Sequence, residues 1–150
     1  TPHGDPYLRA SFAGLTSRHS RKHLTRAVLE GVAFGLRDNY RLLSEIGLAQ
    51  PREVRLSGGG AKSAVWRQII ADVLQLELVT VQSTEGAAYG AALLAGVGVE
   101  VWDHTAEACS KTVKQSEAVQ PNPSYAARYD ETYERFRSLY PALRPLYTPE

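Results

Sequence analysis

Residues Gly58–Gly60 form the stretch of this sequence that most directly suggests chemistry, because three consecutive glycines stand before Ala61, Lys62 and Ser63. Glycine has no Cβ, so such a turn can adopt positive φ and let the backbone approach a ligand closely. The apolar run that follows at helical spacing would add the unpaired N–H groups of a helix N-terminus. The pattern is typical of an anion or nucleotide site, and equally of a tight turn between a strand and a helix. For Lys62 alone, a solvated first-turn lysine is the preferred interpretation.

Two familiar phosphate-binding motifs are close to this stretch, and neither fits. A Walker A loop, GxxxxGK[ST], would need glycines where Leu56 and Ala61 stand. A dinucleotide fingerprint, GxGxxG, begins with Gly58 and Gly60, but its third glycine falls on Ser63. The glycine turn therefore needs a different explanation.

Other residues that could do chemistry do not form complete sets. His19 and His23 are four apart and can share a helix face, yet no third ligand follows at suitable spacing. The sequence therefore predicts surface histidines and no metal site. Neither a Ser-His-Asp set nor a pair of carboxylates can be argued from spacing, so no catalytic residue is expected within residues 1–150.

The glycine turn needs a strand before it and a helix after it, and the sequence supplies both. After Pro51, residues 53–57 predict a short strand and residues 62–74 an amphipathic helix. Residues 77–81 and 85–95 predict a second strand and a helix rich in alanine and glycine. This alternation indicates an α/β fold with parallel strands.

A long helix is predicted over residues 20–46, with Ser20 as its N-cap and Gly47 just past its end. Its stripe of core-facing residues is predicted to be Leu24, Val28, Gly31, Gly35, Leu42 and Ile46. Gly31 and Gly35 are four apart, as are Gly86 and Gly90, and such pairs would let another helix approach closely. Static packing and a hinge between domains both remain open for these pairs.

The C-terminal third gives weaker signals. Residues 105–110 predict a short helix, and residues 113–124, with two prolines, predict a connector. Residues 125–143 predict a helix whose aromatic residues recur every three or four positions: Tyr129, Tyr133, Phe136 and Tyr140. We interpret this stripe as the face of a terminal helix docked on the core rather than as a platform for stacking nucleic-acid bases.

Bulk composition narrows the functional classes. The net charge is +1, from 17 basic and 16 acidic residues spread along the chain, so neither a nucleic acid nor an anionic membrane is an expected partner. Cys109 is the single cysteine, which excludes an internal disulfide, and the composition predicts a cytoplasmic protein. The chain begins with Thr1 and contains no methionine, so we expect a fragment of a longer protein.

The sequence resembles the C-terminal part of the FGGY family of carbohydrate kinases, and within it most closely the members that phosphorylate xylulose. LSGGGAKSAVWRQIIADVL resembles the family's second signature, a nucleotide-binding turn and helix. TPHGDPYLRASFAGLT and HLTRAVLEGVAFGLRDNY resemble an upstream loop and its following helix. STEGAAYGAALLAGVG and YPALRPLY resemble a small-residue helix near the interdomain hinge and the C-terminal end.

The resemblance implies a partial actin-like ATPase domain of ribonuclease H-like type, the C-terminal half of a sugar kinase. Residues 1–150 would be a truncated nucleotide-binding domain, lacking its own first strands and the N-terminal sugar-binding domain. The nucleotide-binding residues would be Gly58, Gly59, Gly60, Ala61 and Ser63. Ser63 stands where some relatives carry an asparagine near adenine. The catalytic aspartate is expected upstream of this chain.

The implied cofactors are ATP and Mg²⁺, and the implied partners are ATP or ADP and a sugar held mainly by the missing domain. A homodimer also remains open. The implied reaction transfers the γ-phosphoryl group of ATP to a sugar hydroxyl, D-xylulose giving D-xylulose 5-phosphate. The chain alone is expected to be inactive. The alternative function is a non-catalytic actin-like module that serves assembly or partner binding.

Overall fold

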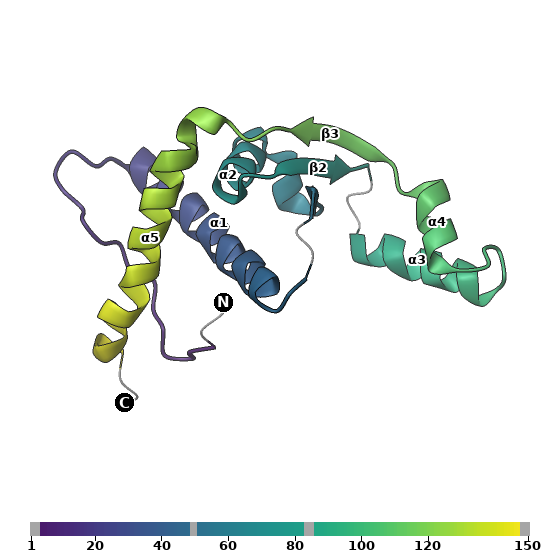
Figure 1. Ribbon diagram of the computed structural model, residues 1–150, viewed down its shortest axis with the longest axis horizontal. Helices are drawn as coiled ribbons and strands as arrows, with labels where there is room; N and C mark the ends of the chain where they lie inside the picture. Colours follow the sequence, from purple (N-terminus) through teal and green to yellow (C-terminus); the bar gives the residue numbers. More distant parts are fainter. Residues whose placement is uncertain (1–3, 49–50, 83–85, 148–150) are drawn as a thin grey trace. The chain divides into compact units, whose positions relative to one another are not determined.

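The structure is a computed structural model that describes residues 4–48, 51–82 and 86–147 (Figure 1). The chain divides into two compact units. The first comprises Thr1–Gln50, Asp72–Gln75 and Asn122–Glu150, and the second comprises Pro51–Ala71 and Leu76–Pro121. Glu85, where the predicted alanine-rich helix was to begin, lies outside the described residues. No helix in the described part of the chain is long and apolar enough to cross a membrane.

The first unit is built on α1 (Arg21–Glu45), whose two ends are those that the sequence predicts. At the start, His23 Nδ1 accepts the Ser20 N–H at 3.1 Å, one bond of a capping box. At the end, Gly47 has φ +81°, and Leu48 N–H donates to Leu43 O at 3.2 Å. This is a Schellman motif, which needs a residue that tolerates positive φ.

Helix α5 (Ala126–Leu143) packs on α1 in the same unit (Figure 1). Along the chain it is preceded by the short 3₁₀ helix η2 (Pro123–Tyr125) and followed by another, η3 (Arg144–Leu146). Phe34 lies at the centre of the contact, with ring centroids 6.1, 5.9 and 5.4 Å from those of Tyr129, Tyr133 and Phe136. Tyr129 and Tyr133 are buried. The prediction that the aromatic stripe docks on a core is confirmed.

Half of the predicted stripe of α1 is wrong: Leu24, Gly31 and Gly35 are half-buried, but Val28, Leu42 and Ile46 are exposed. Val28 is 53% exposed and Ile46 is 73% exposed, whereas the buried residues of α1 are Ala33, Phe34 and Asp38. The helix therefore turns a different face to α5 than its aliphatic residues indicated. The aromatic partners on α5 select Phe34 as the contact, and this choice cannot be read from the periodicity of one helix.

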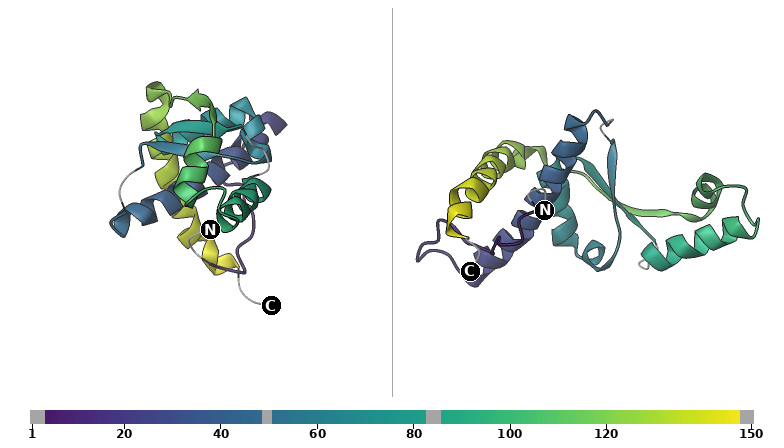
Figure 2. Two further views of the ribbon diagram at one scale, coloured as in Figure 1. Left: turned by 90° about the vertical axis from the view of Figure 1, so that its right-hand side faces the viewer. Right: turned by 90° about the horizontal axis from the view of Figure 1, so that it is seen from below.

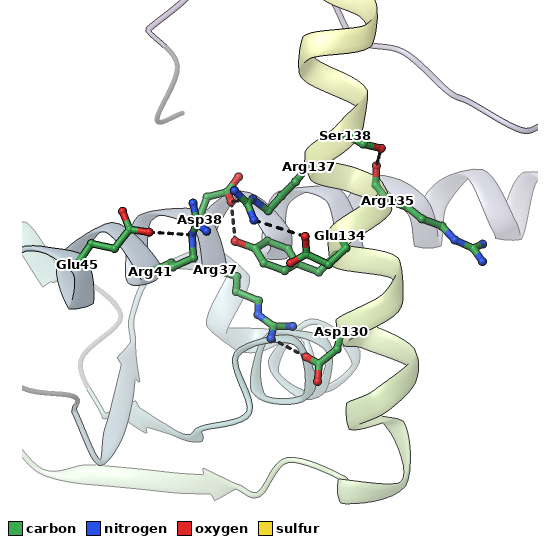
Figure 3. A network of polar contacts seen from close by, with 10 residues as sticks. Arg37, Asp38, Arg41, Glu45, Asp130, Glu134, Arg135, Arg137 and Ser138 are labelled. Carbon is green, nitrogen blue, oxygen red and sulfur yellow. Dashed lines mark hydrogen bonds and ion pairs between the residues drawn. The ribbon is translucent and has the colours of Figure 1, made fainter.

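A polar network joins Arg37 and Asp38 of α1 to residues of α5 (Figure 3). The Tyr133 hydroxyl donates to Asp38 Oδ1 at 2.6 Å, and Arg137 Nε lies 3.8 Å from the same oxygen. Arg37 places its guanidinium carbon 4.5 Å from the centre of the ring and pairs with Asp130 at 2.6 Å. Burial first, and then the hydrogen bond and charge of Asp38, raise the pKa of Tyr133 to about 12.

This shift predicts a loss of stability at alkaline pH. The pKa of Tyr133 lies above its ordinary value of 10.0, so its stabilising contribution is complete below pH 10 and is lost as the pH rises through about 12. Urea melts at pH 8, 10, 11 and 12 should show this loss.

Tyr133→Phe should be less stable than the wild type at pH 8, by about 1–3 kcal/mol, because the buried Asp38 loses its donor. The difference between the two proteins should then shrink above pH 10. The exposed Tyr125 supplies the control, Tyr125→Phe, which should reproduce the wild-type curve. A difference that stays constant from pH 8 to 12 would contradict the prediction.

The second unit is organised around a three-stranded sheet of order β1-β2-β3. β1 (Glu53–Leu56) and β2 (Glu77–Val81) are parallel, as predicted, with Val54 opposite Leu78. β3 (Gln115–Val119) runs antiparallel to β2 (Figure 1), and the register of the pair shifts between Val79 and Val81. The prediction of a connector over residues 113–124 is therefore wrong in its first half. Four of the five β3 residues are exposed, so this edge strand lacks the apolar alternation by which strands are recognised.

Three helices accompany this sheet. α2 (Ala64–Leu74) follows the glycine turn, and its first eight residues belong to this unit. α3 (Gly86–Gly98) and α4 (Thr105–Thr112) lie side by side (Figures 1 and 2). The tightest glycine contact here is Gly96, where a Cβ would lie 2.3 Å from Trp102 Cζ3.

The close helix approach predicted at Gly35 and Gly90 is absent from the described residues. A Cβ built at either position meets no atom within 4 Å. At the other members of the two pairs, a Cβ on Gly31 would reach Phe136 at 4.0 Å, and one on Gly86 would reach the Ser57 hydroxyl at 3.3 Å. The four-residue spacing of small residues thus does not predict which of these positions lies close to another element.

Candidate nucleotide-binding turn

The glycine turn connects β1 to α2 through a 3₁₀ helix, η1 (Gly59–Lys62). Gly58 precedes η1 with φ +88° and ψ −172°. Ala61 N–H donates to Gly58 O at 3.1 Å, and Ser63 N–H donates to Gly60 O at 3.2 Å. The turn is therefore held by its own backbone, and α2 begins two residues after η1 ends rather than at Lys62 as predicted.

The structure explains two of the three glycines of the turn. Gly58 needs its positive φ, which side chains rarely allow. Gly60 lies against Trp66, so a Cβ there would be 3.1 Å from the indole Nε1. Gly59 has no positive φ, and a Cβ on it would meet nothing within 4 Å. The fold of the described residues thus explains Gly58 and Gly60 and leaves Gly59 without a structural reason.

Ser63 serves the start of α2. Its Oγ accepts the Trp66 N–H at 3.3 Å, and its carbonyl accepts the Arg67 N–H at 3.0 Å. This is N-cap geometry, in which a short hydroxyl satisfies one of the donors that a helix leaves unpaired at its first turn. The sequence assigned Ser63 only to adenine, and the structure adds this capping role.

A small cavity of about 160 Å³ opens beside the turn. It is lined by the end of β1, the turn, α2, the end of β2 and the start of β3: Ser57, Gly58, Ala61, Lys62, Arg67, Thr80, Val81, Ser116 and Glu117. Thr80 accepts the Glu117 N–H through its hydroxyl at 3.2 Å, and Arg67 forms an ion pair with Glu117. The ammonium of Lys62 is exposed, and no described residue pairs with it. The cavity therefore offers backbone, hydroxyl and cationic groups.

The volume of this cavity limits what the described residues can hold alone. Sites for small ligands typically enclose about 300–1,000 Å³, so 160 Å³ is too small for a whole nucleotide. Because the strand, turn and helix converge here, the described residues can form one wall of such a site. The carboxyl ends of parallel strands are the usual position for ligands in α/β sheets.

The structure brings together part of the predicted site and adds residues that the sequence did not indicate. Of the five predicted residues, Gly58 and Ala61 line the cavity, whereas Gly59, Gly60 and Ser63 belong to the adjoining turn. The missed residues are Arg67, Thr80, Ser116 and Glu117. Two of them lie on β3, which sequence patterning did not detect, so no local signal pointed to them.

A second, larger cavity of about 490 Å³ shares Ser57 with the first. It extends along α3 and α4, where its lining includes Gly86, Tyr89 and Cys109. The Tyr89 hydroxyl donates to the Thr112 carbonyl at 2.9 Å and so ties the two helices together. Val81 also lines both cavities, so Ser57 and Val81 form the boundary between the glycine turn and the α3–α4 pair.

Elsewhere, the residues that suggested chemistry have structural partners. His23 caps α1, and His19 Nδ1 accepts the Thr16 N–H at 2.9 Å. Asp5 accepts the Tyr7 N–H at 2.9 Å and the Tyr140 hydroxyl at 3.0 Å, and the Tyr7 bond is the largest cause of its lowered pKa. Among residues 4–48, 51–82 and 86–147, no group of three or more His, Cys, Asp or Glu is placed to hold a metal ion.

Comparison with known proteins identifies the family to which this chain is similar. Residues 1–99 match the C-terminal domain of the FGGY family of carbohydrate kinases. Xylulose kinase from Escherichia coli is 38% identical over 148 residues, covering 97% of this chain and 30% of that protein. Glycerol kinase from Borrelia hermsii is 34% identical over 137 residues, covering 89% of this chain and 27% of that protein.

The crystal structure of xylulose kinase from Rhodospirillum rubrum superimposes with a TM-score of 0.82 at 36% identity, over 95% of this chain and 29% of that one. The α/β class and the partial actin-like ATPase fold predicted from the sequence are thereby confirmed. This chain spans about 30% of the length of the relatives that it matches. On the family match and these identities, the chain belongs to the FGGY family of carbohydrate kinases.

Proposed function

We propose that residues 1–150 are the C-terminal nucleotide-binding part of an ATP-dependent sugar kinase, truncated relative to the family's whole domain. Gly58, Gly59, Gly60 and Ala61 would lie against the nucleotide, with Ser63 close to the base. The observation that carries this proposal is Gly59, since neither its φ nor its neighbours among the described residues require glycine. A ligand that approaches the backbone at this point supplies the missing reason.

The residues present fit one side of a bound nucleotide. The N-terminal end of α2 and the exposed Lys62 offer positive potential to phosphates. ATP, when bound, supplies the phosphoryl group. Glu117 is the one acidic residue among the described residues that line the cavity, and it is paired with Arg67. We therefore propose that Mg²⁺ is held through the phosphates and through residues outside this chain.

The sugar is proposed from the relatives alone. Matches to xylulose kinases extend over nearly the whole chain, and we propose D-xylulose, giving D-xylulose 5-phosphate, as the substrate of the complete enzyme. Glycerol kinase is also 34% identical, so the residues shared here do not distinguish xylulose from glycerol as the substrate. The family's catalytic aspartate, which would take the proton of the sugar hydroxyl, is proposed to lie outside residues 1–150.

An NMR titration with ADP tests the nucleotide site in a chimaera in which this chain replaces the matching residues of the Escherichia coli xylulose kinase, so that both walls of the site are present. We expect the amide signals of Gly58 to Ser63 to shift more than those of α5, and Gly59→Val to weaken binding by at least about tenfold, or about 1.4 kcal/mol. The space around Gly59 admits the side chain, so the variant should remain folded.

Gly98→Val is the matched control, because its Cβ also meets nothing within 4 Å and it lies on α3, away from the turn. It should bind ADP like the wild type. Unchanged ADP affinity in folded Gly59→Val would remove the glycine turn from the site. Absence of ADP binding by the wild-type chimaera at about 10 mM ADP would instead favour an assembly module.

A further inference from the structure

Arg67 connects three parts of the candidate site. Its Nη1 donates to the Ala61 carbonyl at 2.7 Å, and its Nη2 donates to the carboxylate of Glu117 on β3. Its backbone N–H also donates to the Ser63 carbonyl at 3.0 Å. The side chain is only 14% exposed, so this guanidinium lies inside the unit rather than over its surface.

The bond to Ala61 fixes the orientation of one peptide plane in the turn. In a trans peptide the carbonyl and the following N–H point in opposite directions. A guanidinium that holds the Ala61 carbonyl therefore also sets the direction of the Lys62 N–H. The same bond keeps the Ala61 carbonyl oxygen pointed at the Arg67 guanidinium, so this oxygen does not face an anionic ligand.

The arrangement is a poor device for stability alone. Arg67 Nε is buried, and no described residue accepts its hydrogen. Burying a charged group with an unpaired donor costs free energy that an apolar side chain of similar length would not. Glu117 is 63% exposed, so the ion pair contributes little stability. The burial of Arg67 is better explained by a requirement for fixed geometry, and the geometry that it fixes is that of the glycine turn.

We propose that Arg67 is a positioning residue for the nucleotide: its guanidinium joins the glycine turn to β3 and holds the turn in the shape that a phosphate-bearing ligand needs. This inference rests on the proposed function, since it assumes that the turn meets the nucleotide. Arg67 itself need not touch the ligand. A turn that is already ordered loses less conformational freedom when the ligand binds, and its affinity rises accordingly.

Substitutions at Arg67 should separate positioning from folding. Arg67→Met keeps the length and apolar stem but makes neither bond, and we expect ADP affinity to fall by about tenfold. Arg67→Lys can make one of the two bonds and should lie between Arg67→Met and the wild type. Arg135→Met is the control, since Arg135 is 77% exposed on α5 and loses the same charge. It should bind ADP like the wild type.

The measurement is an ADP titration of the same chimaera and its variants by NMR, at a temperature well below each variant's melting temperature. A merely structural role would lower the melting temperature of Arg67→Met and leave its ADP affinity unchanged, and that result would overturn the proposal. If Arg67→Met does not fold, Glu117→Gln replaces it, because the amide weakens the anchor on β3 and keeps the side-chain shape. In Glu117→Gln, Arg67 has lost its ionic partner. If this folded variant bound ADP with wild-type affinity, the proposed positioning role of Arg67 would be contradicted. Absence of ADP binding by the wild-type chimaera would refute the nucleotide site itself, and the role of Arg67 with it.

Discussion

The 150-residue chain alone is expected to transfer phosphoryl groups to a sugar at least about a thousandfold more slowly than a complete kinase. Its cavity beside the glycine turn holds 160 Å³, too little for a nucleotide, and the chain spans about 30% of its relatives. Rate acceleration in phosphoryl transfer comes mainly from positioning and electrostatics on both sides of the reacting groups. One wall of the site cannot supply them.

A chimaera provides the positive comparison. The 150-residue chain would replace the matching 148 residues of the Escherichia coli xylulose kinase, which are 38% identical. We expect the chimaera to release ADP from Mg-ATP in the presence of D-xylulose, and the chain alone to remain at the level of a mock purification from a strain without xylulose kinase. Xylulose-dependent turnover by the chain alone above that level would contradict the prediction.

Gly96→Ala is expected to destabilise the chain by about 1–3 kcal/mol, although alanine normally favours a helix. The new Cβ would lie 2.3 Å from Cζ3 and 2.7 Å from Cε3 of Trp102. These are rigid ring atoms rather than the end of a flexible side chain. Either the indole or α3 must move, and the packing between α3 and α4 must change with it.

Gly98→Ala is the matched control, two residues along the same helix, and its Cβ meets nothing within 4 Å. It should be neutral or slightly stabilising in urea melts, so the difference between the two variants isolates the contact with Trp102. Trp102→Leu in the Gly96→Ala background should recover part of the loss, giving a coupling energy between neighbours. Equal stability of Gly96→Ala and Gly98→Ala would show that the contact is not formed in solution.

Local signals in the sequence located most of the elements correctly. Ser20 and Gly47 bound α1, and the glycines after residue 57 separate β1 from α2, because caps and turns are set by residues close together in the chain. The sequence predicted the turn but not what each glycine does in it. Of the three glycines only Gly58 has positive φ, and Gly60 is explained by Trp66.

The parts that sequence analysis missed depend on distant residues. β3 is exposed over four of its five positions, and its identity as a strand comes from pairing with β2 some 40 residues earlier, not from its own pattern. Arg67 becomes part of the site only once β3 is in place, since Glu117 is its partner. In the same way, Phe34 rather than the aliphatic residues of α1 faces α5 because of where the tyrosines lie.

The pairing of β3 has a dynamic consequence. Within the described sheet β3 is bonded on one side only, and its ladder is irregular between Val79 and Val81, where the Thr80 hydroxyl accepts the Glu117 N–H. Such a strand can open locally at a lower free energy than the strand beside it. Each opening would carry Glu117 away from Arg67, so the time that the glycine turn spends in its ordered shape is bounded by the time that β3 spends closed.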